Sequence, residues 1–177
     1  MDEAKRGAMS NFVIYALPVA NGILGIAPLP GRGGHRNADL AHLRDWKPAL
    51  VLSMTTASEM DMNGARDLGS ELQDAGTRWF HVPVVDLGVP EAQVLSDWAL
   101  AEEAALTALR GGGRVLIHCL GGCGRSGMAA LRLMIAEGEP PDGALARLRA
   151  VRPCAVETGD QLDWARVARG TTMPRPS

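Results

Sequence analysis

One segment of the chain concentrates residue types that can bind and attack a phosphate group. It runs from an apolar stretch at 114–118 through Cys119 and a glycine-rich loop to Arg125, and then into a second apolar stretch. A strand, a glycine-rich loop and a helix in this order form an anion site, because backbone N–H groups point into the loop and the helix dipole adds partial positive charge. The segment is therefore predicted to hold a phosphate group beside a thiol.

Each reactive side chain of this loop suits a step of phosphoryl transfer. Arg125 offers a planar fork of donors for two oxygens of one phosphate. Together with the loop amides it would stabilise the Cys119 thiolate, which is a nucleophile for phosphorus. Ser126 could hydrogen-bond the sulfur and ease its departure in a second step. The remaining phosphate-binding positions are predicted to be Leu120, Gly121, Gly122, Cys123 and Gly124.

Length and composition restrict the other classes of function. A chain of 177 residues corresponds to one domain with tails, predicted at 11–169 with flexible tails at 1–10 and 170–177. A net charge of −2 argues against general nucleic-acid binding. No apolar run reaches the ~20 residues of a membrane span, and Pro18 interrupts the short run at 12–20. We therefore expect a cytoplasmic protein with neither nucleic-acid nor membrane partners.

The cysteines predict neither a disulfide framework nor a metal site. Only Cys119, Cys123 and Cys154 are present, and no matching histidine pair completes a zinc set.

The elements around the loop predict an α/β fold: a mainly parallel central sheet flanked by helices, with the Cys-x5-Arg loop between a strand and a helix. Strands alternate with helices along the chain, and the last third is helical. We predict strands at 12–16, 23–28, 49–53, 79–85 and 114–118, with a hairpin turn at Asn21-Gly22. We predict helices at 37–46, 65–75, 92–110, 125–136, 142–150 and 158–169. Asn63 and Asp142 are the expected caps of two of these helices, and Gly76 is an expected helix stop.

The order His118, Cys119, five residues, Arg125, Ser126 and Gly127 resembles the signature of the cysteine-dependent protein tyrosine phosphatases. The flanks look like the dual-specificity branch, most nearly its kinase-associated phosphatase type. The resemblance covers residues 23–165 and includes further stretches at 29–31, 80–90 and 152–161.

The resemblance implies a general acid. Cleavage of a phosphate ester needs a group that protonates the leaving oxygen and then deprotonates the attacking water. Asp86 follows an expected strand and matches the family's position for that acid, although it could also be an ordinary loop aspartate. Glu91 and Asp97 are less favoured candidates, because they fall in or beside a helix start, where acidic residues suit the helix dipole.

Two supporting roles also follow from the resemblance, and each residue could instead be purely structural. Gln161 matches the glutamine that places the hydrolytic water, but Thr158-x-x-Gln161 is also a capping box. His118 matches the histidine that orients the loop and tunes the thiolate, but it could equally be a core histidine.

Residues 55–60 match the region that frames the substrate and contain no aromatic residue. Classical tyrosine-specific members stack a tyrosine there. Its absence implies a shallower cleft that also admits phosphoserine or phosphothreonine.

Several positions near the loop are compatible with more than one role. Cys123 departs from the family's usual apolar or basic residue; it could trap an oxidised Cys119 as a disulfide, or be a small loop residue. Cys154 is expected to be inert packing. Arg32, His35 and Arg36 add positive charge near the site, although an exposed basic loop explains them as well.

The sequence predicts a metal-independent phosphatase that uses a phosphocysteine intermediate and no cofactor. Its partner would be a phosphorylated protein, phosphotyrosine first, or a small phosphate monoester, and phosphate or sulfate would occupy the loop.

Three different functions compete with this prediction. A lipid or nucleotide phosphatase would share the loop, although no positive side chain stands at 120–124 to meet additional phosphate groups. An arsenate reductase-like enzyme would use Cys123 as a partner thiol. A phosphate-reading module without turnover should have lost Cys119, Arg125 or Asp86, and all three residues are present.

Overall fold

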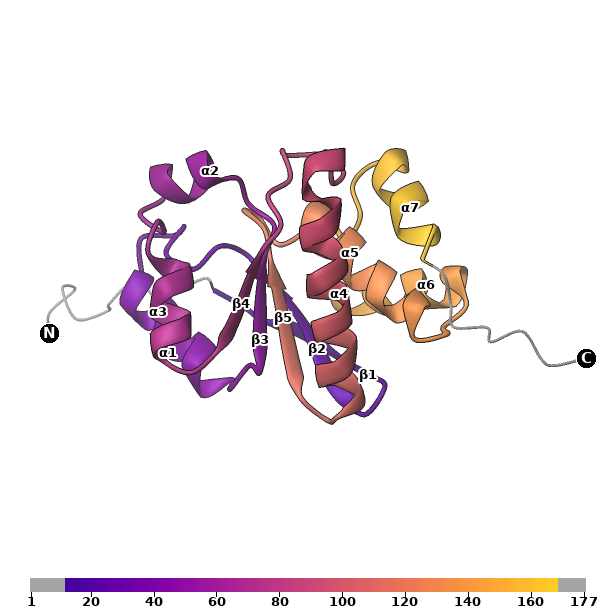
Figure 1. The fold of residues 1–177 in the computed structure, drawn as a ribbon, viewed down its shortest axis with the longest axis horizontal. Coiled ribbons are helices and arrows are strands. Elements are labelled where there is room, and N and C mark those ends of the chain that lie inside the picture. The colour runs from indigo at the N-terminus through magenta and orange to yellow at the C-terminus, as the bar shows by residue number, and fades with distance from the viewer. Residues whose placement is uncertain (1–11, 169–177) are drawn as a thin grey trace, which may run out of the picture.

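The chain forms a five-stranded sheet with helices on both faces (Figure 1). A computed structural model describes residues 12–168; the ends of the predicted domain and its predicted tails lie outside them. The strands lie in the order β1-β2-β5-β3-β4; β1 and β2 are antiparallel, and the other pairs are parallel. Their bounds are β1 Tyr15–Val19, β2 Gly22–Ala27, β3 Leu50–Ser53, β4 Arg78–His81 and β5 Arg114–His118.

The central strands are apolar throughout because both of their faces are covered. In β5, Val115 and Ile117 belong to one hydrophobic cluster, whereas Leu116 belongs to the cluster on the opposite face. This alternation follows from the two-residue period of a strand.

The helices divide between the two faces. Residues of α1 and α3 join the cluster that contains Leu116, whereas α4 and α5 pack on the other face, with α6 and α7 against α5 (Figure 1). The bounds are α1 Arg36–Asp45, α2 Ala57–Met62, α3 Leu68–Asp74, α4 Leu95–Arg110, α5 Gly124–Ala136, α6 Pro141–Val151 and α7 Gly159–Arg166, with a 3-10 turn, η2, at Ala92–Val94.

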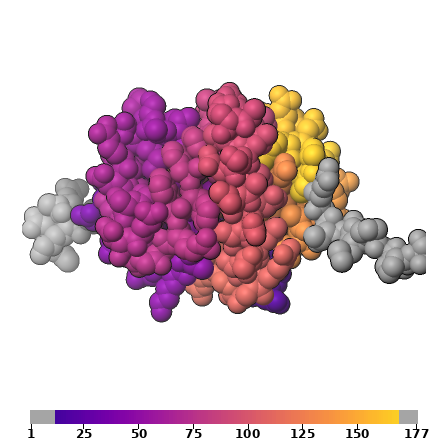
Figure 2. Space-filling model, viewed as in Figure 1, coloured from indigo at the N-terminus to yellow at the C-terminus, as the bar shows by residue number. Residues whose placement is uncertain are grey.

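The topology places the glycine-rich loop at the carboxyl edge of the parallel strands. This loop, residues 119–125 and called the phosphate loop below, follows the middle strand β5 and begins α5. Ligands of parallel α/β sheets bind at this edge. The segment around α2, the loop between β4 and α4, and α7 all lie along the upper edge in Figures 1 and 2.

The first strand begins later than the sequence predicts. It spans Tyr15–Val19 rather than 12–16, and the hairpin turns at Ala20 and Asn21, where Ala20 has a positive φ of 50°. Pro18 is tolerated inside β1 because this strand lies at the edge of the sheet.

The prediction of a helix at 65–75 capped by Asn63 is wrong. The structure has two short helices there, and Asn63 ends α2 while Asp67 precedes α3. The polar segment that forms α2 lacks the apolar periodicity that signals a helix, so only its capping box indicates that one begins there. Gly76 does stop α3, with a φ of +85°.

Two other helix starts also differ from the prediction. Asp142 lies in the first turn of α6 and is not its cap, because the helix begins at Pro141. The helix predicted to begin at 92 starts with the turn η2. Among residues 12–168, no helix combines the length and apolar character needed to cross a bilayer.

Candidate active site

The carbonyl groups of the phosphate loop are held outward by neighbouring donors. Leu120 O accepts a hydrogen bond from Leu29 N at 3.1 Å. Arg152 donates from Nε to Gly122 O at 2.9 Å and from Nη2 to Gly121 O at 3.1 Å. Since each peptide unit carries its N–H opposite its C=O, this outward fixation turns the amides toward the centre of the loop.

These amides are open to a ligand. Within residues 12–168, no backbone N–H of residues 120–125 donates a hydrogen bond to the protein. The tight curvature depends on Gly122, whose φ is +71° and where a Cβ atom would lie 2.7 Å from the Ala27 carbonyl carbon. The loop therefore offers a ring of donors for the oxygens of an anion.

Cys119 lies at the start of this ring and is 3% exposed. Its Sγ is 3.2 Å from Ser126 Oγ, in the first turn of α5. The sequence predicts this pair, and the structure brings the two atoms within hydrogen-bonding distance.

Arg125 is buried, and its donors are largely assigned. Nη1 donates to Glu59 Oε1 at 2.6 Å and to Val84 O at 2.7 Å, and Nη2 donates to Glu59 Oε2 at 2.8 Å. Nε has no partner among the described residues. Of the five N–H groups, the one on Nε and one on Nη2 are left, and they lie along one edge of the guanidinium. This edge suits two oxygens of one phosphate.

Glu59 is a site residue that the sequence does not reveal. Its ion pair with Arg125 lowers the pKa of the Glu59 carboxyl to about 2, even though burial acts in the opposite direction. Glu59 is held by a capping box with Thr56 at the start of α2. The pattern Thr56-x-x-Glu59 could have revealed the helix start, but not its partner on α5.

Asp86 stands beside the open edge of Arg125. Its Oδ1 lies 3.7 Å from Arg125 Nη2 and accepts a hydrogen bond from Leu87 N at 3.0 Å, and its side chain is 69% exposed. Leu87 has a positive φ of 62° in the turn that closes with Gly88 N donating to Val85 O.

The two less favoured acids have different surroundings. Glu91 is exposed and accepts a hydrogen bond from Gln93, and Asp97 is exposed in the first turn of α4.

His118 is a buried neutral histidine with both ring nitrogens in contact. Trp79 Nε1 donates to Ser53 Oγ at 2.9 Å, Ser53 Oγ lies 2.5 Å from His118 Nε2, and His118 Nδ1 lies 3.2 Å from Cys119 O. Each donor in this series of hydrogen bonds meets an acceptor when the Ser53 hydroxyl donates to His118 Nε2 and the His118 Nδ1–H donates to Cys119 O. Burial is the largest cause that lowers the pKa of His118 to about 4. No pattern in the sequence singles out Ser53 or Trp79.

Gln161 connects the segments around the site. Its Oε1 accepts from Glu157 N at 2.9 Å, and its Nε2 donates to Gly88 O at 3.1 Å. Its own N–H donates to Thr158 Oγ1, so Thr158 caps α7, but the side chain of Gln161 does not complete the box. Its amide also lies against Gly124, where a Cβ atom would come within 2.9 Å of Oε1. Gln161 thus joins α7 to the Asp86 turn beside the phosphate loop.

The cysteine expectations need correction. Cys123 forms a disulfide with Cys154, with their Cα atoms 5.2 Å apart, and Cys119 is free. Cys154 is therefore not inert packing, and Cys123 is neither an isolated loop residue nor a partner of Cys119. The segment before α7 returns to the phosphate loop, and cysteine spacing alone does not show this long-range approach.

The fold and this site define a cysteine-dependent phosphatase of the dual-specificity class. The solved structure of kinase associated phosphatase with its catalytic-site cysteine substituted by serine matches with a TM-score of 0.77 and 24% identity, over 89% of this chain and 93% of that one. Tk-PTP in its active form matches with a TM-score of 0.65 and 25% identity, over 81% of this chain and 88% of that one.

The comparison of sequences gives the family. The family model described as Cyclin-dependent kinase inhibitor 3 (CDKN3) matches residues 20–145. The Mus musculus protein of that name is 33% identical over 148 residues, which cover 80% of this chain and 69% of the mouse protein. The chain belongs to the cyclin-dependent kinase inhibitor 3 family.

Proposed function

We propose that this chain removes phosphate from phosphorylated proteins through a phosphocysteine formed on Cys119. The observation that carries the proposal is the open edge of Arg125. This buried guanidinium keeps Nε and one Nη2 N–H free, beside a loop whose amides are also free. Together they would neutralise the equatorial oxygens as charge develops in the transition state.

In the first step the Cys119 thiolate attacks phosphorus as the bond to the ester oxygen breaks. Asp86 would give its proton to that leaving oxygen; the position of its carboxyl, 3.7 Å from Arg125 Nη2, supports this role. In the second step Asp86 takes a proton from the attacking water, and the S–P bond breaks to release phosphate. The Ser126 hydroxyl, 3.2 Å from Sγ, stabilises the departing thiolate.

Gln161 and His118 act on the site from its periphery. Gln161 would hold the Asp86 turn and help to place the water, through its contact with Gly88 O. His118 would fix the start of the phosphate loop through Cys119 O.

We propose phosphotyrosine as the first substrate class, with phosphothreonine and phosphoserine also admitted. The segment at 55–60 supports this breadth because it has no aromatic residue to deepen the pocket. Residues 120–124 carry no cationic side chain that would favour an inositol lipid. A phosphorylated protein kinase is the first protein to test, because the relatives are named for cyclin-dependent kinases.

The test is hydrolysis of p-nitrophenyl phosphate by the wild type and by Cys119→Ser, with EDTA present. Acid quenching during turnover should trap a phosphoryl group on the Cys119 peptide of the wild type. We expect the folded variant to lose turnover and the trapped adduct. A folded Cys119→Ser protein with wild-type turnover would overturn the proposal.

A further inference from the structure

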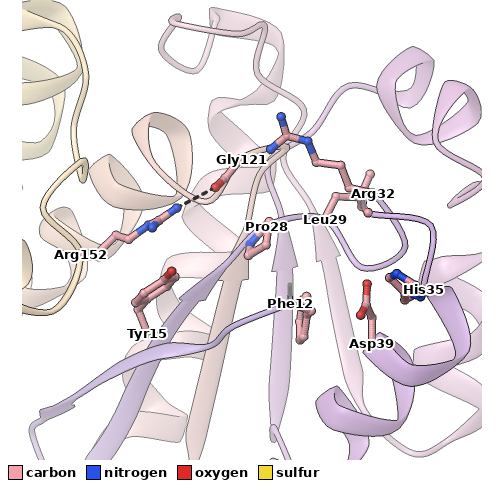
Figure 3. A pocket seen from close by; sticks show the side chains of 10 residues that line it. Phe12, Tyr15, Pro28, Leu29, Arg32, His35, Asp39, Gly121 and Arg152 are labelled. Atoms are coloured by element: carbon pink, nitrogen blue, oxygen red, sulfur yellow. Dashed lines mark hydrogen bonds between the residues drawn. The ribbon is translucent and has the colours of Figure 1, made fainter. Parts of the chain in front are cut away.

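A cavity of about 330 Å³ opens beside the phosphate loop, on the side away from α5. Gly121 forms part of its wall, so the cavity and the phosphate site share one piece of backbone. Figure 3 shows the guanidinium groups of Arg32 and Arg152 approaching Gly121 from two different segments of the chain. The proposed mechanism makes no use of this cavity.

Two cations at the loop end of the cavity, Arg32 and Arg152, have no carboxylate partner among residues 12–168. Arg32 Nη1 donates to Leu120 O at 3.3 Å, and Arg152 donates to Gly121 O and Gly122 O. Neither arginine forms an ion pair within the described part of the chain. Two loop carbonyls hold the half-buried Arg152, and exposed Arg32 contacts a third. No carboxylate within the described part of the chain compensates either positive charge.

The neighbouring Arg36 gives the contrast. Its guanidinium lies 2.6 Å from the Glu71 carboxylate, so its charge is neutralised. Positive charge in this region is therefore concentrated at Arg32 and Arg152, next to the phosphate loop.

The rest of the cavity combines apolar and aromatic walls with two polar side chains, His35 and Asp39, at its far end. The Tyr15 ring lies 4.2 Å below the Arg152 guanidinium, and Phe12 and Leu29 are buried wall residues. Asp39 lies in the first turn of α1, away from Gly121 in Figure 3, and its Oδ2 accepts a hydrogen bond from Gly31 N. A ligand would therefore direct its negative end to the loop and its apolar part toward the rings.

We infer that this side cavity is a second anion subsite, which takes a negatively charged side chain of the same substrate that presents its phosphoresidue to Cys119. The inference rests on the proposed function and narrows the substrate class to segments with two nearby anions. A phosphotyrosine matches both the cationic end and the aromatic walls, whereas glutamate matches only the charge. The two arginines act on this group directly, as specificity residues.

The test uses phosphotyrosine peptides with neutral flanks and a matched series with one added anion at each flanking position in turn. The anion is glutamate in one arm and a non-hydrolysable phosphonate analogue of phosphotyrosine in the other. We expect kcat/KM of the wild type to rise about tenfold when the anion stands at one particular position, and tenfold corresponds to about 1.4 kcal/mol. The rise should be larger with the phosphonate than with glutamate. The preference is a ratio within each protein, so general damage to the loop cancels.

The variants are Arg32→Gln, Arg152→Gln and the double variant, because glutamine can still donate to a loop carbonyl but carries no charge. The preference should fall in each single variant and disappear in the double variant. Arg36→Gln is the matched control and should keep it, because Glu71 already neutralises that arginine. A double variant that keeps the full preference would overturn the inference, as would an active wild type with no preference at any position.

Binding separates this inference from the proposed function. In a Cys119→Ser background, the affinity for the same peptides is measured without turnover. We expect the doubly anionic peptide to bind about tenfold more tightly than the singly anionic one, and the gain to vanish with both arginines changed. This gain would support the subsite even if the wild type hydrolysed none of the peptides, and equal affinities would overturn it even in an active phosphatase.

Discussion

Glu59 and Arg125 form a bidentate ion pair that joins α2 to the start of α5. Each carboxylate oxygen accepts from a different terminal nitrogen, at 2.6 and 2.8 Å. The pair leaves the adjacent edge of the guanidinium, formed by Nε and Nη2, free to bind phosphate. Glu59 is thus a positioning residue for the phosphate-binding arginine.

Replacing Glu59 with glutamine keeps the shape of the side chain and removes its charge. We expect kcat/KM for p-nitrophenyl phosphate to fall about tenfold, because the phosphate-binding edge loses its fixed orientation. The free energy of unfolding should fall by about 1–3 kcal/mol, since a charged hydrogen-bonded pair is lost. Steady-state kinetics and urea unfolding measure both effects.

The control is Asp61→Asn on the same helix, which breaks an exposed ion pair with Arg66 and should change neither quantity appreciably. A Glu59→Gln enzyme with wild-type kinetics would show that Arg125 keeps its orientation without this carboxylate.

Removing the carboxyl of Asp86 should affect substrates according to their leaving groups. For Asp86→Asn we expect kcat to fall about 100-fold on phenyl phosphate, whose phenoxide needs protonation, and far less on p-nitrophenyl phosphate. The measurement is kcat for a series of aryl phosphates of increasing leaving-group basicity. Glu91→Gln, on the same loop, is the control and should leave the series as in the wild type. Equal losses across the series in Asp86→Asn would assign the acid to another group.

The phosphate loop could be predicted from the sequence because its geometry is local. The apolar run at 114–118 coincides with β5, and the glycines and Arg125 follow it within the next seven residues. Cys119, Arg125 and Ser126 lie within eight consecutive residues, so their proximity can be expected from the sequence alone. The mainly parallel sheet can also be predicted from the sequence, since alternating strands and helices favour parallel pairing.

The contacts that orient the loop could not be found in the same way. Glu59 meets Arg125 across 66 residues, and Ser53 meets His118 across 65. Both contacts depend on β3 lying beside β5 in one particular register, which pairs Ser53 with His118. Composition and periodicity predict that strands exist, but they do not give their order.

His118 predicts a pH dependence of stability. Burial lowers its pKa to about 4, whereas the unfolded chain protonates this histidine near its ordinary value of 6.5. Between these values the unfolded state binds more protons, so the free energy of unfolding decreases as the pH falls from 6.5 toward 4. The contribution is about 3 kcal/mol over the whole window.

Urea unfolding across this pH window measures the effect for the wild type and for His118→Asn. The variant should lose most of this pH dependence, because the group that titrates is gone. His42→Asn, at an exposed position on α1, should retain it. If His118→Asn and the wild type lose stability in parallel as the pH falls, the dependence comes from other groups.

The Cys123–Cys154 disulfide should stabilise the fold without taking part in turnover. It links residues 31 apart in sequence, and closing a loop of that length in the unfolded chain corresponds to about 3–4 kcal/mol. We expect a dithiol reductant to lower the free energy of unfolding of the wild type by about this amount. Cys154→Ser should have the lower free energy of unfolding even without reductant, and adding the reductant should not change it. The reductant should destabilise Cys119→Ser as much as the wild type, because Cys119 is not part of the disulfide. Loss of the response in Cys119→Ser would instead place Cys119 in the bond that the reductant breaks.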